Sequence, residues 1–303
     1  AAPFAVLDTI YQAEVLIKSA DPNVQLPALV VNWSKNNKPT SGNKALGEIT
    51  SSHYAPADGS LYILGSADLD TDEYDTHVMA HEWGHYFENK LGRSDTTGGS
   101  HSPEDILDPR LAFGEAWGNA LSGMVFNDPI YIDTGGASQA SIGLKLNLDT
   151  DSAPDTKTYT TTTNATYLVD GFYSEASVQE VLYDLFDSGT STADDDSLSL
   201  GFKPIYDVMV GGQKTTSAYT TIFSFLKYLK DANPTNSAAI DALAAAENIG
   251  SGDEYEATLQ RIYTTVPVDG TTVTKDVDLL PLQTWADIGP ITASDPGNKL
   301  FNR

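Results

Sequence analysis

Residues 78–87 read VMAHEWGHYF, and this stretch decides how the rest of the chain is interpreted. It contains an H-E-x-x-H pattern, with His81 and His85 four residues apart and Glu82 between them. Residues at i and i+4 of a helix lie on one face, so the two imidazoles can share a zinc ion. Glu82 is then placed to act as general base toward a zinc-activated water. The pattern predicts a helix at about 72–91 that carries a zinc site.

The residues around the motif are apolar, which favours a buried helix. A pair of hydrogen-bonded core histidines is the alternative interpretation, although buried His and Glu side chains need partners in either case. Gly84 is explained either by close approach of another backbone or the substrate, or by ordinary packing against a bulky side chain. His77 lies about 12 Å along the helix axis from His85, so we expect it at the surface or behind the ligands.

A catalytic zinc usually has three protein ligands and a water, so the motif needs a further ligand. The metzincin pattern requires a glycine at position 88 and a histidine at position 91, and this chain has Glu88 and Leu91 there. That class is therefore excluded. The candidates downstream of the motif are His101, Glu104, Asp105, Asp108 and Glu115.

Glu115 is the favoured third ligand. It lies in AFGEAWGN, residues 112–119, within an otherwise small and apolar segment expected to form a helix. A carboxylate on a buried helix is costly unless a cation or metal accompanies it. Asn119 follows four residues later and can orient a zinc histidine from the second shell. His101 is the main rival as ligand, and solvent exposure or a salt bridge to Arg110 is the alternative for Glu115.

The motif at 81–85, followed by GEAWGN at 114–119, resembles the gluzincin zinc metallopeptidases, including the thermolysin-like and fungalysin-like enzymes. The resemblance covers about residues 72–124 and indicates a bacterial exported family of this type. It implies a zincin-like fold, with a second helix supplying the glutamate ligand. It also implies a Tyr or His that stabilises the oxyanion; Tyr173, where helical order resumes, is favoured, and His101 is next. Asn119 stands where those families place a carboxylate.

The order of the expected elements indicates an α+β fold. A small twisted N-terminal sheet and the motif helix form a lobe at 1–91, and a mostly helical lobe at 92–303 supplies the third ligand within one catalytic unit. Helical spacing predicts helices at 3–19, 109–124, 174–187, 202–210, 216–230, 236–248 and 252–264, whereas residues 127–170 look irregular. Strands are expected at 29–33, 49–54 and 61–64. We expect Leu61–Leu64 to be the edge strand that binds substrate.

The net charge of −25 argues against nucleic acid and anionic membranes as partners. No apolar run is long enough for a membrane span. The absence of cysteine excludes disulfides and Cys-ligated zinc. A start at Ala1 without Met suggests a mature form or a piece of something longer. Abundant Thr, Ser, Asp and Gly with few Lys is typical of a secreted or cell-envelope bacterial protein.

Three acidic segments resemble oxygen-rich calcium loops, although none fits the EF-hand pattern. Solvated loops and charges at helix N-termini are favoured over Ca²⁺ binding, which stays open. The segments contain Asp68, Asp70, Asp72 and Asp75; Asp149, Asp151 and Asp155; and Asp194–Asp196.

The sequence therefore predicts a zinc-dependent metallopeptidase that acts on a peptide or protein substrate. Two alternatives remain: a zinc hydrolase of a non-peptide amide or glycan-linked substrate, and a zinc-binding domain without catalysis. The intact Glu82 disfavours the last of these.

Overall fold

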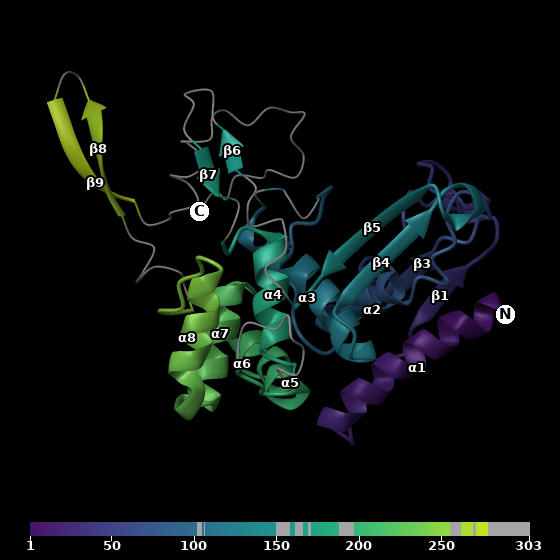
Figure 1. Ribbon diagram of the computed structural model, residues 1–303, viewed down its shortest axis with the longest axis horizontal. Helices are drawn as coiled ribbons and strands as arrows, with labels where there is room; N and C mark the ends of the chain where they lie inside the picture. The colour runs from purple at the N-terminus through teal and green to yellow at the C-terminus, as the bar shows by residue number, and fades with distance from the viewer. Residues whose placement is uncertain are drawn as a thin grey trace.

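The computed structural model describes residues 1–101, 105, 107–149, 171–187 and 197–254, and the backbone of four strands beyond these ranges (Figure 1). The helices are α1 (Ala2–Ala20), α2 (Thr76–Lys90), α3 (Pro109–Phe126), α4 (Glu175–Asp184), α5 (Phe202–Val210), α6 (Gly212–Thr215), α7 (Ile222–Ala232) and α8 (Ser237–Ala246). The strands are β1 (Val30–Trp33), β2 (His53–Ala55), β3 (Ser60–Ile63), β4 (Ile130–Gly135), β5 (Ile142–Asn147), β6 (Thr158–Thr160), β7 (Thr166–Leu168), β8 (Ile262–Val268) and β9 (Thr271–Val277). Short 3₁₀ turns lie at Lys44–Leu46, Ala137–Gln139 and Pro234–Asn236.

The chain is an α+β protein whose N-terminal sheet has three strands in the order β1-β3-β2. β1 runs parallel to β3, and β2 pairs with β3 antiparallel across the turn at 56–59. The prediction that Leu61–Leu64 forms an edge strand is wrong. Strand β1 pairs with β3 on the side opposite to β2, so β3 is the central strand of the sheet. β2 is the edge strand on the side of the motif helix.

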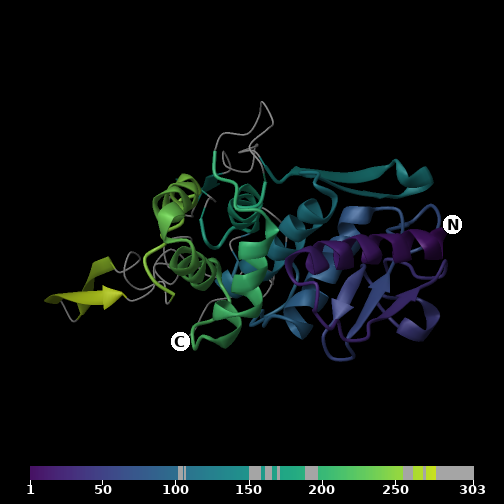
Figure 2. The same cartoon turned by 90° about the horizontal axis from the view of Figure 1, so that it is seen from below.

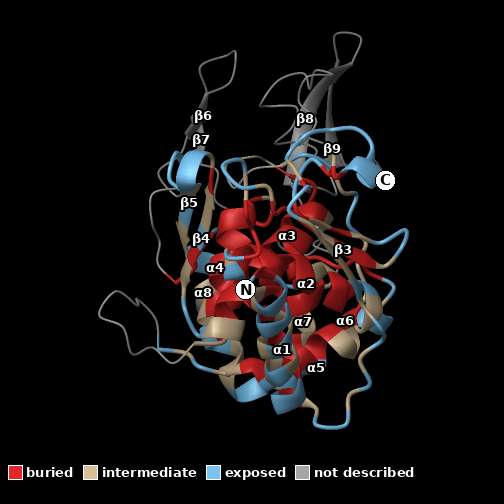
Figure 3. Ribbon diagram, turned by 90° about the vertical axis from the view of Figure 1, so that its right-hand side faces the viewer, coloured by how far each residue is buried: buried red, intermediate tan, exposed pale blue. Residues whose placement is uncertain are grey.

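Helix α2 lies in the middle of the molecule, between the sheet, α1 and α3 (Figures 1 and 2). Its apolar side chains Trp83 and Phe87 are at most 1% exposed and pack on each other, and Phe87 also packs on Trp117 of α3. Figure 3 shows the buried residues concentrated on α2, α3 and α4, while the outer face of α1 is exposed. The motif is therefore held by the most deeply buried helices of the fold.

The predicted helices up to residue 248 are present, with shifted ends. α2 begins at Thr76 rather than at about 72, because the acidic residues before it form turns, with the Asp70 N–H donating to the Ser66 carbonyl and the Tyr74 N–H to the Thr71 carbonyl. Asp108 caps α3 through its side chain, which accepts from the Arg110 N–H. The helix predicted at 216–230 begins later, as α7 at Ile222, because residues 216–221 after the end of α6 are not helical.

Two predictions for the C-terminal part are wrong. The segment 127–170 is not irregular throughout, because β4 and β5 form an antiparallel hairpin and β6 pairs with β7. The end of the helix predicted at 252–264 is replaced by strand β8, which pairs with β9. Each of these pairs is a local hairpin between strands that follow one another in the chain. The division into lobes at 91 and 92 stays a prediction.

Among the residues that the structure describes, no helix combines the length and the apolar character that a membrane crossing requires.

Candidate metal centre

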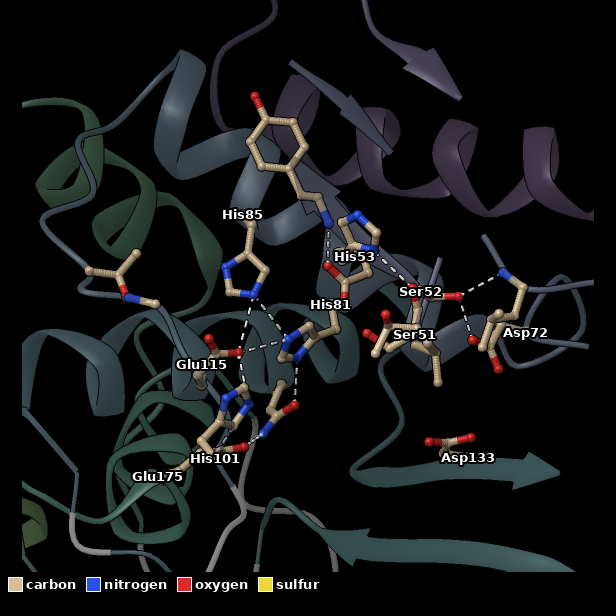
Figure 4. A pocket seen from close by; sticks show the side chains of 18 of the residues that line it. Ser51, Ser52, His53, Asp72, His81, His85, His101, Glu115, Asp133 and Glu175 are labelled. Atoms are coloured by element: carbon tan, nitrogen blue, oxygen red, sulfur yellow. Dashed lines mark hydrogen bonds and ion pairs between the residues drawn. The ribbon is translucent and has the colours of Figure 1, made fainter. Parts of the chain in front are cut away.

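Helices α2 and α3 bring three potential ligand atoms into one small triangle (Figure 4). The Nε2 atoms of His81 and His85 lie 3.1 Å apart. Each lies 3.2 Å from Oε2 of Glu115. The sequence placed the two histidines on one helix face, and the packing of α3 against α2 adds the carboxylate.

This triangle fits a zinc ion. Zinc binds His nitrogen and carboxylate oxygen at about 2.0–2.2 Å, so two ligands of a tetrahedral site are separated by about 3.4 Å. The observed separations of 3.1–3.2 Å are close to that value. Two imidazoles and one carboxylate also form a donor set of catalytic zinc sites, which leave a fourth position open. His81, His85 and Glu115 are thus the residues that would hold the metal.

A hydrogen-bonded chain behind His81 orients its ring. His81 Nδ1 lies 2.6 Å from Oδ1 of Asn119. The Asn119 amide nitrogen donates to Glu175 Oε1 at 2.7 Å and to Gln179 Oε1 at 2.8 Å. Because both amide protons have acceptors, Oδ1 must accept the proton of His81 Nδ1. This arrangement leaves the lone pair of His81 on Nε2, which faces the triangle.

Glu88 stands behind the second histidine in a comparable way. His85 Nδ1 lies 3.5 Å from Glu88 Oε2. The Glu88 side chain is only 1% exposed, and burial raises its pKa. Metal-binding histidines usually donate their other ring N–H to a carboxylate or carbonyl. Both histidines therefore present Nε2 to the triangle and Nδ1 to a polar partner.

His101 reaches the same centre from the loop between α2 and α3. Its Nε2 lies 3.2 Å from Glu115 Oε2 and 3.9 Å from Glu175 Oε2 (Figure 4). The group of ligand atoms that all lie within 4.8 Å of one another contains His81, His85 and Glu115 but not His101. The geometry thus places His101 beside the triangle rather than at one of its corners.

Among the neighbouring side chains, Glu115 has the largest effect on the pKa values of the histidines His85 and His101. Burial opposes ionisation of Glu115, but the positive charge of His85 and hydrogen bonds from His101 and His81 hold its pKa well below the usual range. Burial likewise opposes protonation of His85, yet Glu115 raises the pKa of His85 well above its ordinary value. For His101 burial is again outweighed by Glu115, and its pKa rises to about 9. A divalent cation would replace these protons as the partner of the carboxylate.

Glu82 lines a cavity of about 760 Å³ that also contains the three ligands. Its Oε2 accepts a hydrogen bond of 2.7 Å from the backbone N–H of Tyr54. Tyr54 belongs to the edge strand β2, so the candidate general base is held between the motif helix and the sheet. The opposite wall of the cavity includes Tyr131, Leu144 and Leu146 of the β4–β5 hairpin.

Two other predicted residues lie away from the triangle. Tyr173 packs with Phe172 against the hydrophobic core, and it is not among the described residues that line the cavity. Its assignment to the oxyanion stays a prediction without geometric support. His77 is 7% exposed and packs against Phe126 and Tyr131, so it belongs to the interior rather than the surface.

Close approach of α2 and α3 occurs at two glycines. A Cβ on Gly84 would lie 3.0 Å from the Cα of Gly118. A Cβ on Gly118 would lie 2.7–2.9 Å from three atoms of the His81 ring. Of the two explanations for Gly84, the approach of another backbone is the one observed.

Gly118→Ala is therefore expected to displace the His81 ring or to separate the helices. We expect a loss of about 1–3 kcal/mol in the free energy of unfolding, as for an overpacked core, together with weaker zinc binding. Urea unfolding and metal titration measure both effects. Gly114→Ala on the same helix is the control, because its Cβ would make only ordinary contacts from 3.5 Å outward. It should gain up to about 1 kcal/mol from helix propensity, so equal losses for the two variants would contradict the steric argument.

Sequence reasoning missed Glu88, Glu175 and Gln179 as partners of the centre. Glu88 could have been found by the argument used for Glu115, since it is a carboxylate one turn from His85 on an apolar helix. Glu175 and Gln179 lie on α4, and only the packing of α4 on α3 brings them to Asn119. Tyr131 could not be predicted as a residue of the cavity either, because the β4–β5 hairpin was not predicted.

No protein-family model matches the sequence, and no curated protein matches it either. The geometry and chemistry of the site therefore carry the functional conclusion.

Proposed function

We propose that this chain is a zinc-dependent metallopeptidase of the gluzincin type, with a zincin-like fold. One observation carries the proposal: the 3.1–3.2 Å triangle of His81, His85 and Glu115 atoms opens into a cavity that also holds Glu82. The contact of His81 Nδ1 with Asn119 supports it, because it commits His81 Nε2 to the triangle, and Glu88 lies 3.5 Å from His85 Nδ1.

Each polar group at the centre has a defined part in amide hydrolysis. A bound zinc ion supplies a Lewis acid and lowers the pKa of a coordinated water toward neutrality. Glu82 accepts the proton of the attacking water and can deliver it to the leaving amine. Its hydrogen bond from Tyr54 fixes one carboxylate oxygen and so orients the other. His101, whose Nε2 lies 3.2 Å from Glu115 Oε2, is placed to donate to the developing negative charge on the carbonyl oxygen.

The edge strand β2 supports a peptide as substrate. The Tyr54 N–H points away from β3 and toward Glu82, so the free edge of β2 borders the cavity. Because the Tyr54 N–H is already donated to Glu82, an extended peptide would lie along this edge and use the other backbone groups there, which presents its amide bonds to the adjacent centre. The apolar side chains of Val78, Leu144 and Leu146 on the cavity walls suit the side chains of a peptide.

The first test is metal content. Purified protein prepared without added metal is expected to contain about one zinc per chain, and a chelator should remove both the zinc and the hydrolysis of an unstructured protein such as casein. Elemental analysis and a fluorescent casein assay measure these quantities, and re-addition of zinc should restore activity. Absence of zinc would refute the metal assignment. Stoichiometric zinc without peptide hydrolysis would instead favour a non-peptide amide substrate or a binding role.

A further inference from the structure

A second group of possible ligands lies across the cavity from the histidines. One carboxylate oxygen from each of Asp70, Asp72, Asp75 and Asp133 lies within 4.8 Å of the others. The first three precede α2, whereas Asp133 comes from β4. The sequence grouped Asp70, Asp72 and Asp75 with Asp68, but it could not bring in Asp133 because the hairpin was not predicted.

Asp72 supplies an observation that is independent of the number of acidic residues. Its side chain is only 3% exposed, and Ser52 donates a hydrogen bond to its Oδ2. Its Oδ1 is buried and has no hydrogen-bond partner within the described part of the chain, and the same holds for Oδ1 of Asp70. An unsatisfied buried carboxylate oxygen is costly. The orphaned oxygens are thus the atoms that a cation in this cluster would satisfy.

The negative charge of the four aspartates also favours a bound cation. Within the described part of the chain, no lysine, arginine or histidine forms an ion pair with any of the four aspartates. Burial, and after it the neighbouring Asp70, raises the pKa of Asp72 to about 9. Burial and the charge of Asp70 raise the pKa of Asp133 to about 6. Without a cation, the cluster has to take up protons to stay together.

The backbone around the cluster is already held in place. Asp70 forms a β-bridge with Gly135 at the end of β4. The Asp75 carboxylate accepts from the N–H of Thr134 at 3.0 Å, and Asp68 Oδ1 accepts from the N–H of Ser138 at 2.9 Å. The loop before α2 and the β4–β5 hairpin therefore meet at the four carboxylates, and an ion there would join them.

We propose that Asp70, Asp72, Asp75 and Asp133 form a Ca²⁺ site that fastens the β4–β5 hairpin to the loop preceding the motif helix. Ca²⁺ takes oxygen ligands at about 2.3–2.6 Å, so oxygens on opposite sides of one ion are separated by about 4.8 Å. The four carboxylate oxygens all lie within 4.8 Å of one another, so a single ion could contact all of them. Zinc favours sites with nitrogen or sulfur ligands, and Mg²⁺ keeps most of its waters, so an all-carboxylate cluster suits Ca²⁺ best.

The consequence concerns the shape of the cavity. Figure 4 shows Asp72 and Asp133 on one side of the pocket and His85, His101 and Glu115 on the other. Asp72 also lies in a chain of contacts to the sheet, because the Ser52 hydroxyl accepts a hydrogen bond from the N–H of Leu64. Ca²⁺ would hold the wall that carries Tyr131 in register with the wall that carries Glu82. The site is separate from the zinc ligands, and its existence does not depend on hydrolysis.

The test is a Ca²⁺ titration of the full zinc-loaded chain, followed by calorimetry and by thermal unfolding. The wild-type protein is expected to bind one Ca²⁺, with a Tm that rises with Ca²⁺ concentration. Asp133→Asn should weaken Ca²⁺ binding by about tenfold or more, since it removes one charged ligand. Asp72→Asn should do the same, and its zinc content and circular dichroism report whether it folds. Asp68→Asn removes a charge from the same loop outside the cluster and should bind Ca²⁺ as the wild type does.

Three outcomes would overturn the proposal. The first is a wild-type protein that shows neither Ca²⁺ binding heat nor a Ca²⁺-dependent Tm. The second is an equal loss in Asp68→Asn, which would indicate a diffuse surface effect. In the third, Ca²⁺ does not bind but peptides containing lysine or arginine bind the wild type and not Asp133→Asn. The cluster would then be a pocket for a basic substrate side chain, because it borders the same cavity.

Discussion

Glu82→Gln is expected to abolish hydrolysis while leaving the zinc in place. The substitution keeps the length of the side chain and an oxygen that can still accept the hydrogen bond from Tyr54, so the local structure should remain. It removes the only function that requires a carboxylate at this position, which is to take a proton from the attacking water. A positioned general base contributes about 10²–10⁴-fold, and we expect kcat/KM to fall by at least that factor. Casein hydrolysis and zinc content, measured on the same preparation, test both parts.

Glu88→Gln provides the matched control for a buried carboxylate on the same helix. Glu88 contacts His85 Nδ1 rather than the substrate side of the centre, so its loss should lower zinc affinity by about 10–100-fold. Excess zinc should then restore turnover to Glu88→Gln but not to Glu82→Gln. If Glu82→Gln keeps full turnover, Glu82 is not the general base, whatever the metal does.

Glu115→Ala is expected to lose the zinc, whereas His101→Ala should retain it. Oε2 of Glu115 is one corner of the triangle, 3.2 Å from both histidine Nε2 atoms. Without it two nitrogen ligands remain, and the negative charge that would balance the zinc ion is lost. Removing an outer partner already costs about 10–100-fold in metal affinity, so removing a ligand should cost more than about a hundredfold. Competition with a zinc-binding dye measures the affinity of each variant.

His101→Ala is the informative comparison because its Nε2 is equally close to Glu115. We expect it to lower kcat more than zinc affinity, since His101 is placed beside the triangle and toward Glu175. Glu115→Gln removes the negative charge of the side chain and keeps its size. It should bind zinc more weakly than wild type and more tightly than Glu115→Ala. If His101→Ala loses the metal and Glu115→Ala keeps it, the gluzincin assignment fails although a metallohydrolase would remain. Thermal unfolding of each variant shows whether it is folded.

Local sequence signals predicted most of the elements that build the centre. The helix around His81 and the helix around Glu115 follow from apolar spacing and from the Asp108-Pro109 start, and both are present near the expected positions. Asn119 was expected to orient either His81 or His85, and the structure places its Oδ1 2.6 Å from Nδ1 of His81. These successes share one cause: a helix turns by a known angle per residue, so its sequence states which side chains share a face.

The failures share a cause as well. β3 was expected at the edge of the sheet, but strand order depends on which distant segments pair, and β1 occupies that edge. The β4–β5 hairpin was missed although Ile142, Leu144 and Leu146 alternate along it, and its position depends on contacts with Asp75 and Asp70 of another segment. Of the acidic segments, residues 151, 155 and 194–196, like the candidate ligand Glu104, lie outside the described residues. Asp149 is buried at 7% exposure rather than solvated.

The sequence by itself determined the chemistry at hand: two imidazoles one turn apart, a carboxylate between them, a second apolar helix with a single carboxylate, and no cysteine. These are properties of residue type and helical period, which act over a few residues. Only the tertiary structure decided that Glu115 rather than His101 completes the triangle, and that Asp133 joins Asp70, Asp72 and Asp75. Both choices depend on the packing of helices and on strand pairing between segments far apart in the chain, where the distance between two side chains is set by the whole core.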